Sequence, residues 1–290
     1  MTDRAFAVVR AGALTTVQDL GRAGHAHLGV PRSGALDADA HRLANRLVGN
    51  GPGAATLETT VTGCAIRMRS AGTVAVTGAP CPVTVDGRPV AWGAPVHVPA
   101  DAVLEVGTAT YGLRSYLAFA GGIEAEPVLG SRATDLLSGL GPDPLTDGAV
   151  LPLGTPGAPV PAADAVPHAG PARELVLPVR LGPRDDWFTG AGVRTLLTGV
   201  WRVSSASNRI GLRTEGPSLE RARDGELPSE GMALGAVQVP PNGLPVLFLA
   251  DHPTTGGYPV IGVVRESALS TAAQATPGTP VRFVRAHSAS

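Results

Sequence analysis

Glycine and proline recur so often in this chain that they limit the length of any helix it can form. The sequence contains 38 glycines and 27 prolines, more than a fifth of its 290 residues, whereas about 12% is usual. Both residues destabilise helix interiors and favour turns. Because 43% of the residues are apolar, the chain can still bury a proper core. The composition therefore predicts many short strands joined by tight turns.

Short apolar or alternating runs, separated by Gly, Pro and Asp-Gly turns, occupy most of the chain and indicate strands. Their spacing is typical of an antiparallel barrel or sandwich. We expect strands at Phe6–Arg10, Cys64–Met68, Val74–Thr77, Val83–Val85, Val96–Val98, Val103–Val106, Arg114–Ala120, Leu175–Leu181, Trp201–Ser204 and Val246–Ala250.

Local signals also predict one hairpin, one clear helix and one long loop. Asp86-Gly87 is a strong hairpin signal. The helix is expected at Leu36–Val48, capped by Asp37 and ended by Gly49. By contrast, residues 12–34 are so polar and glycine-rich that we expect them to lie outside the core.

A segment rich in proline, alanine and glycine divides the chain. Residues 154–171 are almost without charge, as expected of a linker. We therefore place an N-terminal β-barrel subdomain at residues 1–153 and a C-terminal one at residues 172–287. A weak repeat, in which Gly63 and Val74–Thr77 recur about 172 residues later at Gly235 and Val246–Leu249, favours two related halves.

The charged residues exclude several functions. All 23 basic side chains are arginine, so a Walker-type phosphate loop, a Schiff-base lysine and a covalently attached biotin are all impossible. A formal net charge of -1 with only 4% aromatic residues argues against nucleic-acid binding. Any phosphate would be held by arginine, hydroxyl or backbone groups.

Neither a membrane span nor a signal peptide is predicted. No window of eighteen apolar residues exists, and Met1–Leu14 lacks the pattern of a cleaved leader. Cys64 and Cys81 have no metal-binding spacing, so we interpret them as small core residues. These features are typical of a cytoplasmic protein.

The stretch Ser229–Val264 carries the densest run of strand, turn and polar signals in the sequence. Asp251 follows the apolar run Val246–Ala250, so a carboxylate is expected where a buried strand ends. Next, Thr254–Gly257 joins two hydroxyls to two glycines, whose backbone N–H groups can approach a phosphate or carboxylate. The alternative interpretation is an ordinary turn, because Gly-Gly and Tyr-Pro are turn formers.

Other polar residues extend this set of candidates. Arg32 and Ser33 precede the predicted helix, whose N-terminus can bind an anion, although a capping loop explains them equally well. His25 and His27 lack a third ligand and are interpreted as loop residues. The candidate catalytic residues are Arg209, Glu230 and Asp251, and the candidate ligand-binding residues are Arg32, Ser33, Asn208, Arg213, Gln238, Thr254, Thr255, Gly256, Gly257 and Tyr258.

Long blocks of the chain resemble the biotin-dependent carboxyltransferase-like family. This family contains the C subunit of 5-oxoprolinase, allophanate hydrolase subunit 2 and the Kip-type antagonist of a kinase inhibitor. The resemblance implies a mainly β fold of two cyclophilin-like β-barrel subdomains with a few short helices. The blocks that carry it are Thr15–Asn50, Phe119–Gly141, Gly182–Phe188, Arg202–Pro217 and Ser229–Val264.

The resemblance also implies a function and partners. The chain would be the C subunit of an ATP-dependent 5-oxoprolinase complex that hydrolyses 5-oxo-L-proline to L-glutamate. Its partners would be the A subunit of this complex and a B subunit that is allophanate hydrolase subunit 1-like. ATP, with Mg²⁺, would be bound by or shared with a partner and would phosphorylate the lactam oxygen. Arg209 and Thr254–Gly257 would hold charged oxygens, while Glu230 or Asp251 would contact the lactam N–H, a metal ion or water.

Two alternatives remain open at this point. One is a biotin-dependent carboxyltransferase or allophanate hydrolase-type protein that accepts carboxybiotin from a separate carrier. The other is a non-catalytic regulator that binds a kinase-inhibitor-like partner. The sequence does not separate these functions, because arginines, carboxylates and hydroxyls suit binding as well as catalysis.

Overall fold

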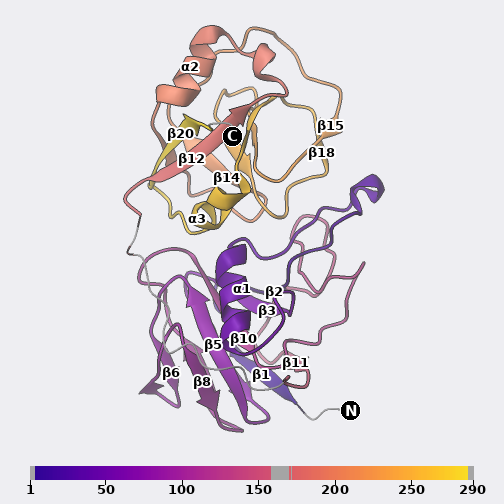
Figure 1. Cartoon of the computed structure of the whole chain (residues 1–290), viewed down its shortest axis with the longest axis vertical. Helices are drawn as coiled ribbons and strands as arrows, with labels where there is room; N and C mark the ends of the chain where they lie inside the picture. The colour runs from indigo at the N-terminus through magenta and orange to yellow at the C-terminus, as the bar shows by residue number, and fades with distance from the viewer. Residues whose placement is uncertain (1–3, 158–169, 171, 287–290) are drawn as a thin grey trace. The chain divides into compact units, whose positions relative to one another are not determined.

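The computed structural model describes residues 4–157, 170 and 172–286, and it is mainly β with a few short helices (Figure 1). The predicted fold class is therefore confirmed. Residues 158–169 and 171, most of the predicted linker, lie outside the described residues. Contacts divide the chain into an N-terminal unit, Met1–Arg22, Ser33–Asp135 and Gly139–Pro171, and a C-terminal unit, Ala23–Arg32, Leu136–Ser138 and Ala172–Ser290.

The N-terminal unit contains eleven described strands in two antiparallel sheets. The strands are β1 (Ala5–Arg10), β2 (Thr15–Gln18), β3 (Thr56–Thr60), β4 (Ala65–Met68), β5 (Gly72–Gly78), β6 (Val83–Val85), β7 (Arg88–Pro89), β8 (Pro95–Val98), β9 (Val103–Val106), β10 (Arg114–Phe119) and β11 (Val150–Pro152). The six-stranded sheet has the order β11-β1-β4-β9-β6-β7, and the five-stranded sheet has the order β2-β3-β10-β5-β8.

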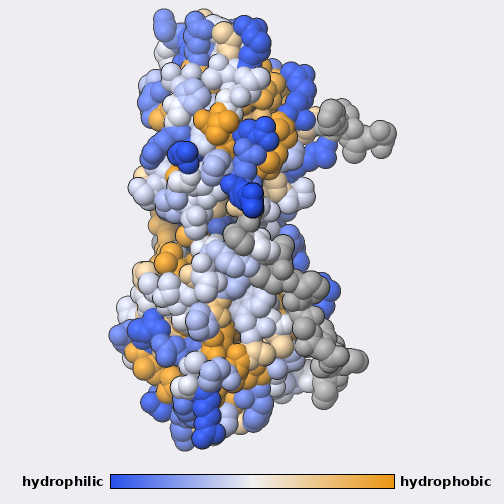
Figure 2. All heavy atoms as spheres, turned by 90° about the vertical axis from the view of Figure 1, so that its left-hand side faces the viewer, coloured by the Kyte–Doolittle hydropathy of each residue, from blue (hydrophilic) through white to orange (hydrophobic). Residues whose placement is uncertain are grey.

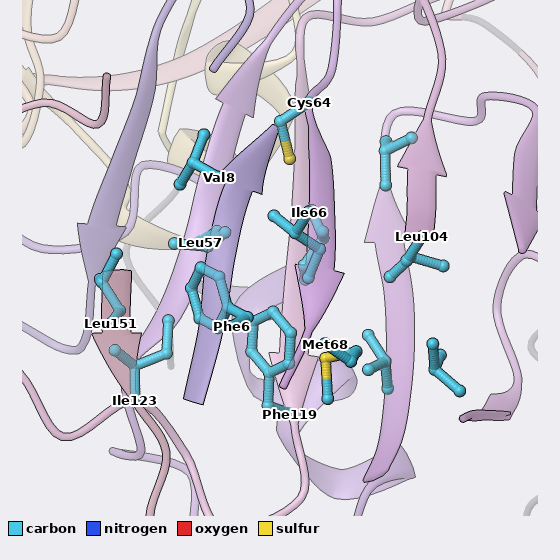
Figure 3. Close-up of a cluster of buried hydrophobic side chains, with 14 of the residues drawn as sticks. Phe6, Val8, Leu57, Cys64, Ile66, Met68, Leu104, Phe119, Ile123 and Leu151 are labelled. Carbon is cyan, nitrogen blue, oxygen red and sulfur yellow. The ribbon is translucent and has the colours of Figure 1, made fainter. Parts of the chain in front are cut away.

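The core of this unit lies between the two sheets. Side chains that alternate along the strands point inward from both sheets and form one buried cluster (Figure 3). Phe6 on β1 stacks on Phe119 on β10, with ring centroids 4.8 Å apart, and so joins the sheets. Cys64 and Cys81 belong to the same cluster as free, buried thiols, which confirms their prediction as core residues.

Helix α1 (Ala38–Leu47) covers the outer face of the five-stranded sheet. Asp37 caps it by accepting a hydrogen bond from the Ala40 N–H at 3.0 Å. Gly49, just after the helix, has a positive φ of 78°. The predicted helix and its cap are thus confirmed. Since α1 covers one face and the core the other, all six residues of β10 are buried.

A closed barrel forms the C-terminal unit. Its order is β12-β19-β16-β17-β14-β13-β20, and only the β12–β20 pair is parallel. Trp201 and Phe283 pack edge to face in its interior. The strands are β12 (Leu175–Leu181), β13 (Trp201–Val203), β14 (Gly211–Glu215), β16 (Ala236–Gln238), β17 (Val246–Phe248), β19 (Val260–Val264) and β20 (Pro280–Arg285).

The C-terminal unit also contains short elements outside the barrel. Strands β15 (Glu230–Gly231) and β18 (Thr255–Gly256) pair in a separate ribbon, at the right of this unit in Figure 1. The helices are α2 (Gly190–Thr198), α3 (Leu269–Ala273), η1 (Ala26–Leu28), η2 (Asp185–Trp187) and η3 (Glu266–Ala268).

The structure corrects the prediction that residues 12–34 lie outside the core. All four residues of β2 are buried, because Thr134 and Leu145 donate backbone hydrogen bonds to its outer edge at 2.9 and 2.8 Å. Hydroxyl and amide side chains therefore occupy the interior here.

The surface mixes apolar and polar groups. Figure 2 shows hydrophilic and hydrophobic side chains interspersed over the visible face. Among the described helices, none is long and apolar enough to cross a membrane.

Candidate functional site

Buried polar side chains of the N-terminal unit gather where β2 ends. Most residues of these types are exposed in proteins, so such a concentration is informative. We call this set the β2 polar cluster. Its members are Gln18, Asp19, Arg22, Ser33, Ser131 and Thr134, each less than 8% exposed.

Asp19 organises the loops of the β2 polar cluster. One carboxylate oxygen accepts hydrogen bonds from the Ser131 hydroxyl at 2.6 Å and the Gly21 N–H at 2.7 Å. The other accepts the Arg132 N–H at 2.7 Å. Charge-assisted bonds of this kind are the stronger ones, so Asp19 fixes the loop after β2 against the segment around Ser131.

Gln18 and Thr134 are in contact, and each has a polar atom without a protein partner. The Gln18 Nε2 donates to the Thr134 carbonyl at 2.9 Å and to the Thr16 hydroxyl at 3.1 Å. The Gln18 Oε1 and the Thr134 Oγ1 are buried and accept or donate no hydrogen bond within the described chain. Leaving such atoms unsatisfied is costly, so this position favours a polar ligand or a bound water.

Backbone strain occurs beside the same residues. Ser33 has φ of 54° and Gly34 has φ of 99°, and the Ser33 hydroxyl donates to the Thr134 carbonyl at 3.0 Å. A Cβ on Gly34 would lie 2.8 Å from the Gly21 nitrogen, so only glycine fits. Strained non-glycine residues often occur at functional sites.

The predicted anion site at the start of α1 is occupied by the chain's own side chains. The Leu36 N–H donates to a carboxylate oxygen of Glu58 at 3.0 Å, and the Asp37 N–H donates to the Tyr116 hydroxyl at 2.8 Å. Ser33 is buried, whereas Arg32 is exposed. The two residues therefore do not form a joint anion site at these N–H groups.

Three buried ionisable side chains, those of Glu58, Tyr116 and the α1 residue His41, lie between α1 and the five-stranded sheet. The Tyr116 hydroxyl donates to Glu58 at 2.7 Å, and Arg114 Nε is 3.6 Å from the other Glu58 oxygen. Burial raises the pKa of Tyr116 well above its usual value, and the Glu58 charge raises it further. Burial lowers the pKa of His41 to about 4, so its imidazole is neutral at pH 7. Both rings therefore hold fixed protonation states.

In the C-terminal unit, Arg209 and Asp251 form a buried ion pair. Two guanidinium nitrogens donate to the two carboxylate oxygens at 2.9 and 3.0 Å, and both side chains are about 1% exposed or less. Asp251 also accepts the Leu136 N–H at 3.2 Å. Two predicted catalytic residues are thus brought together, as partners of each other in the interior of the unit.

Glu230 is held differently, near the surface. Arg184 contacts both of its carboxylate oxygens, and Nε lies 3.0 Å from each. The hydrogen bond from Arg184 holds the pKa of Glu230 below its usual value. With 29% of its side chain exposed, Glu230 is an ionised carboxylate that solvent can reach.

Within the segment Thr254–Gly257, which we predicted to be a turn with anion-facing N–H groups, the middle residues Thr255 and Gly256 form the short paired strand β18, and Thr254 and Gly257 are bends on either side of it. Thr255–Gly256 pair with β15, and the Met232 N–H donates to the Thr254 carbonyl at 2.9 Å. Neither glycine has positive φ. A Cβ at Gly256 would lie 2.8 Å from the Gln238 Nε2, so the end of the Gln238 side chain would have to shift.

The other candidates in this unit are only partly grouped. Gln238 donates to the Tyr258 carbonyl at 3.3 Å, which places Gln238, Glu230, Thr255 and Tyr258 around the β15–β18 ribbon. Asn208 closes its own turn by accepting the Ile210 and Gly211 N–H groups. Arg213 is exposed on β14.

A metal centre is not formed by the described residues, where no group of three or more His, Cys, Asp or Glu side chains could hold an ion. His25 directly precedes η1, and His27 lies within it at an exposed position.

Of the β2 polar cluster, only Ser33 was among the residues predicted from the sequence, and Glu58 was not predicted. One available signal was the run Thr15-Thr16-Val17, whose β-branched residues favour a strand.

Together these observations define a class: a two-unit, mainly β protein whose buried polar groups lie at strand ends. Residues 28–285 match the family described as carboxyltransferase domain, subdomain A and B. The chain belongs to this family.

Known proteins similar to the chain include an enzyme subunit of similar length and enzymes that are much longer. Over 285 residues it is 39% identical to the 5-oxoprolinase C subunit of Escherichia coli, a match that covers 96% of this chain and 90% of that protein. It is 34% identical to urea amidolyase of Lachancea kluyveri, covering 97% of this chain but 17% of that protein. The solved Kluyveromyces lactis urea carboxylase aligns with a TM-score of 0.88 at 32% identity, covering 97% of this chain and 27% of that one.

Proposed function

We propose that the protein is the C subunit of an ATP-dependent 5-oxoprolinase, which hydrolyses 5-oxo-L-proline to L-glutamate with its partner A and B subunits. One observation carries this proposal: the 39% identity to the Escherichia coli protein extends over nearly the full length of both chains. The match to urea amidolyase, in contrast, covers a small part of a much longer protein.

An amide is a poor electrophile, so the reaction needs activation of the lactam oxygen, which phosphorylation by ATP supplies. In this proposal ATP and Mg²⁺ are bound by, or shared with, a partner protein. The described residues offer arginine and hydroxyl donors but no acidic cluster for the metal ion. No step is therefore assigned to a nucleotide on this chain.

The residues best placed for chemistry are the accessible ones. Glu230 is ionised and partly exposed beside Arg184, so its carboxylate can orient an attacking water by accepting a hydrogen bond from it, while the lowered pKa makes it a weak base. Arg209 and Asp251 form a buried ion pair with each other, so we assign them a positioning role. Asp251 holds the backbone of Leu136, and Arg209 holds Asp251.

Reconstitution tests the proposal. Glutamate and phosphate release from 5-oxoproline and ATP is measured with this chain and its two candidate partners, and each protein is omitted in turn. We expect turnover only when all three are present. A stable three-protein complex that releases no glutamate would contradict the proposal.

The second candidate is a carboxyltransferase that accepts carboxybiotin from a separate carrier. The family match and the urea amidolyase relatives favour it. Since the chain has no lysine, biotin would arrive on another protein. Activity on urea that avidin abolishes, with no glutamate release from 5-oxoproline, would support this function over the first.

A further inference from the structure

Gln18 and Thr134 present a donor and an acceptor that the described chain leaves unused. Both residues are at most 2% exposed, and the Gln18 Oε1 and Thr134 Oγ1 have no protein partner. The two side chains belong together, because the Gln18 Nε2 donates to the Thr134 carbonyl at 2.9 Å. In a well-satisfied interior, two such atoms on contacting residues indicate a place for a polar guest.

The orientation of the Gln18 carboxamide follows from its neighbours. A carbonyl oxygen can only accept, so the NH₂ group must face the Thr134 carbonyl. The Gln18 Oε1 is therefore left as an acceptor. The Thr134 hydroxyl can donate or accept. A complementary guest presents one N–H to Gln18 and one oxygen to Thr134.

We propose that this pair binds the amide edge of a small cis amide, such as a lactam, a urea or a primary amide. In these compounds an N–H and the C=O lie on the same edge, whereas a trans peptide directs them to opposite sides. An acceptor on Gln18 and a donor on the residue that it contacts, Thr134, suit the first arrangement. The proposal rests on the proposed function, whose substrate is a lactam, and assigns residues to the amide.

Charge and rigidity around the pair support this assignment. The Arg22 guanidinium donates to the carbonyls of Val128 and Ala133, the residue before Thr134, so a fixed positive charge lies close by. Positive charge near an amide oxygen favours the form in which that oxygen carries negative charge. The Ser33 hydroxyl also holds the Thr134 carbonyl, which limits movement of the site.

Binding of a matched ligand pair tests the site without partners or ATP. NMR titrations of the full chain with 2-pyrrolidinone and N-methyl-2-pyrrolidinone compare ligands that differ in the N–H. We expect the N-methyl compound to bind roughly tenfold more weakly or worse, since a buried acceptor loses its donor. In Gln18→Met the two ligands should bind equally, and Thr134→Val should weaken binding where Thr134→Ser does not.

A matched control separates binding from folding. Thr59 is also buried and donates to a backbone carbonyl, that of Ser115 at 3.4 Å, so Thr59→Val should lower thermal stability without changing the ligand preference. Equal binding of both ligands by the wild type would overturn the proposal. So would a crystal structure in which a water stays between Gln18 and Thr134 while 5-oxoproline binds elsewhere.

Kinetics of the assembled complex distinguish this inference from the proposed function. We expect Gln18→Met and Thr134→Val to raise KM for 5-oxoproline or lower kcat about tenfold or more. If the wild-type complex turns over 5-oxoproline and both variants match it, the amide site is wrong while the function stands. If ligand discrimination is observed but no complex turns over 5-oxoproline, the function is wrong while the site stands.

Discussion

Arg209 and Asp251 show how a residue pair predicted to be catalytic can instead be a structural requirement. Their side chains are buried and joined by two hydrogen bonds. Removing one partner leaves the other charged in a dry environment, which costs far more than a surface pair. An inactive alanine variant at either position would therefore not identify a catalytic group.

We expect Arg209→Ala to lower the free energy of unfolding by roughly 3–5 kcal/mol, measured by chemical denaturation. Arg223→Ala is the control, since its pair with Asp186 is more than half exposed and should cost less than about 1 kcal/mol. Equal losses for the two variants would contradict the buried-pair assignment. The double change Arg209→Met with Asp251→Leu should recover part of the loss.

Glu230 offers a cleaner test of chemistry, because it is partly exposed. Glu230→Gln keeps the shape of the side chain and removes its charge. We expect little loss of stability, as for other surface pairs, but a loss of turnover of about 100-fold or more if Glu230 orients the attacking water. Full activity of the variant complex would remove Glu230 from the mechanism.

His41 makes the stability of the α1 region dependent on pH. Its imidazole is bonded to the Thr56 hydroxyl at 2.9 Å, and burial lowers its pKa from 6.5 to about 4. The unfolded chain therefore binds a proton that the folded chain excludes, so this stabilisation is present above pH 6.5 and is lost as pH falls toward 4. The shift corresponds to about 3 kcal/mol. Denaturation between pH 7 and 4 should show this loss, and His41→Gln should reduce it, whereas His97→Gln, at an exposed position on β8, should not.

At the scale of elements, the loop that precedes α1 depends on one close backbone contact, between Gly34 and Gly21. A Cβ at Gly34 would meet the Gly21 nitrogen at 2.8 Å, whereas one at Gly87 would meet nothing within 4 Å, and both glycines have positive φ. Gly87→Ala thus measures backbone strain alone, about 1–2 kcal/mol. We expect Gly34→Ala to cost at least about 2 kcal/mol more. Thermal denaturation that shows equal costs would contradict this contact.

Elements with local signals could be predicted, and elements that depend on distant partners could not. Asp37 and Gly49 fix the ends of α1, and Asp86-Gly87 adopts the two positive φ values that a tight hairpin needs. In contrast, β2 reads as a loop because the residues that bury its edge, Thr134 and Leu145, are more than a hundred positions away. For the same reason, only Ser33 of the β2 polar cluster could be predicted. Glu230 and Asp251 were predicted as site residues, but their ion pairs with Arg184 and Arg209 were not.

At the scale of the whole molecule, the chain passes between its two units five times. Leu136–Ser138 and Ala23–Arg32 group with the C-terminal unit, although they lie far from Ala172 in sequence. The Leu136 N–H is a partner of Asp251, and hydrogen bonds to a charged group contribute about 1.5–3 kcal/mol.

A fragment that begins at Ala172 lacks this donor. We expect it to be less stable than the C-terminal unit in the intact chain, by at least about 1.5 kcal/mol. Hydrogen exchange of barrel amides, for example in β14 and β17, measures the difference. Equal protection in the fragment and the intact chain would contradict this expectation.

The interleaved path also limits how genes for such proteins can be rearranged. A recombination event that joins one half to a foreign partner at a single crossover would separate the barrel from two of its own segments. Fusions at either end avoid this problem, because they leave every crossing intact. Exchange of the complete two-unit block is therefore the change that we expect to yield folded hybrids.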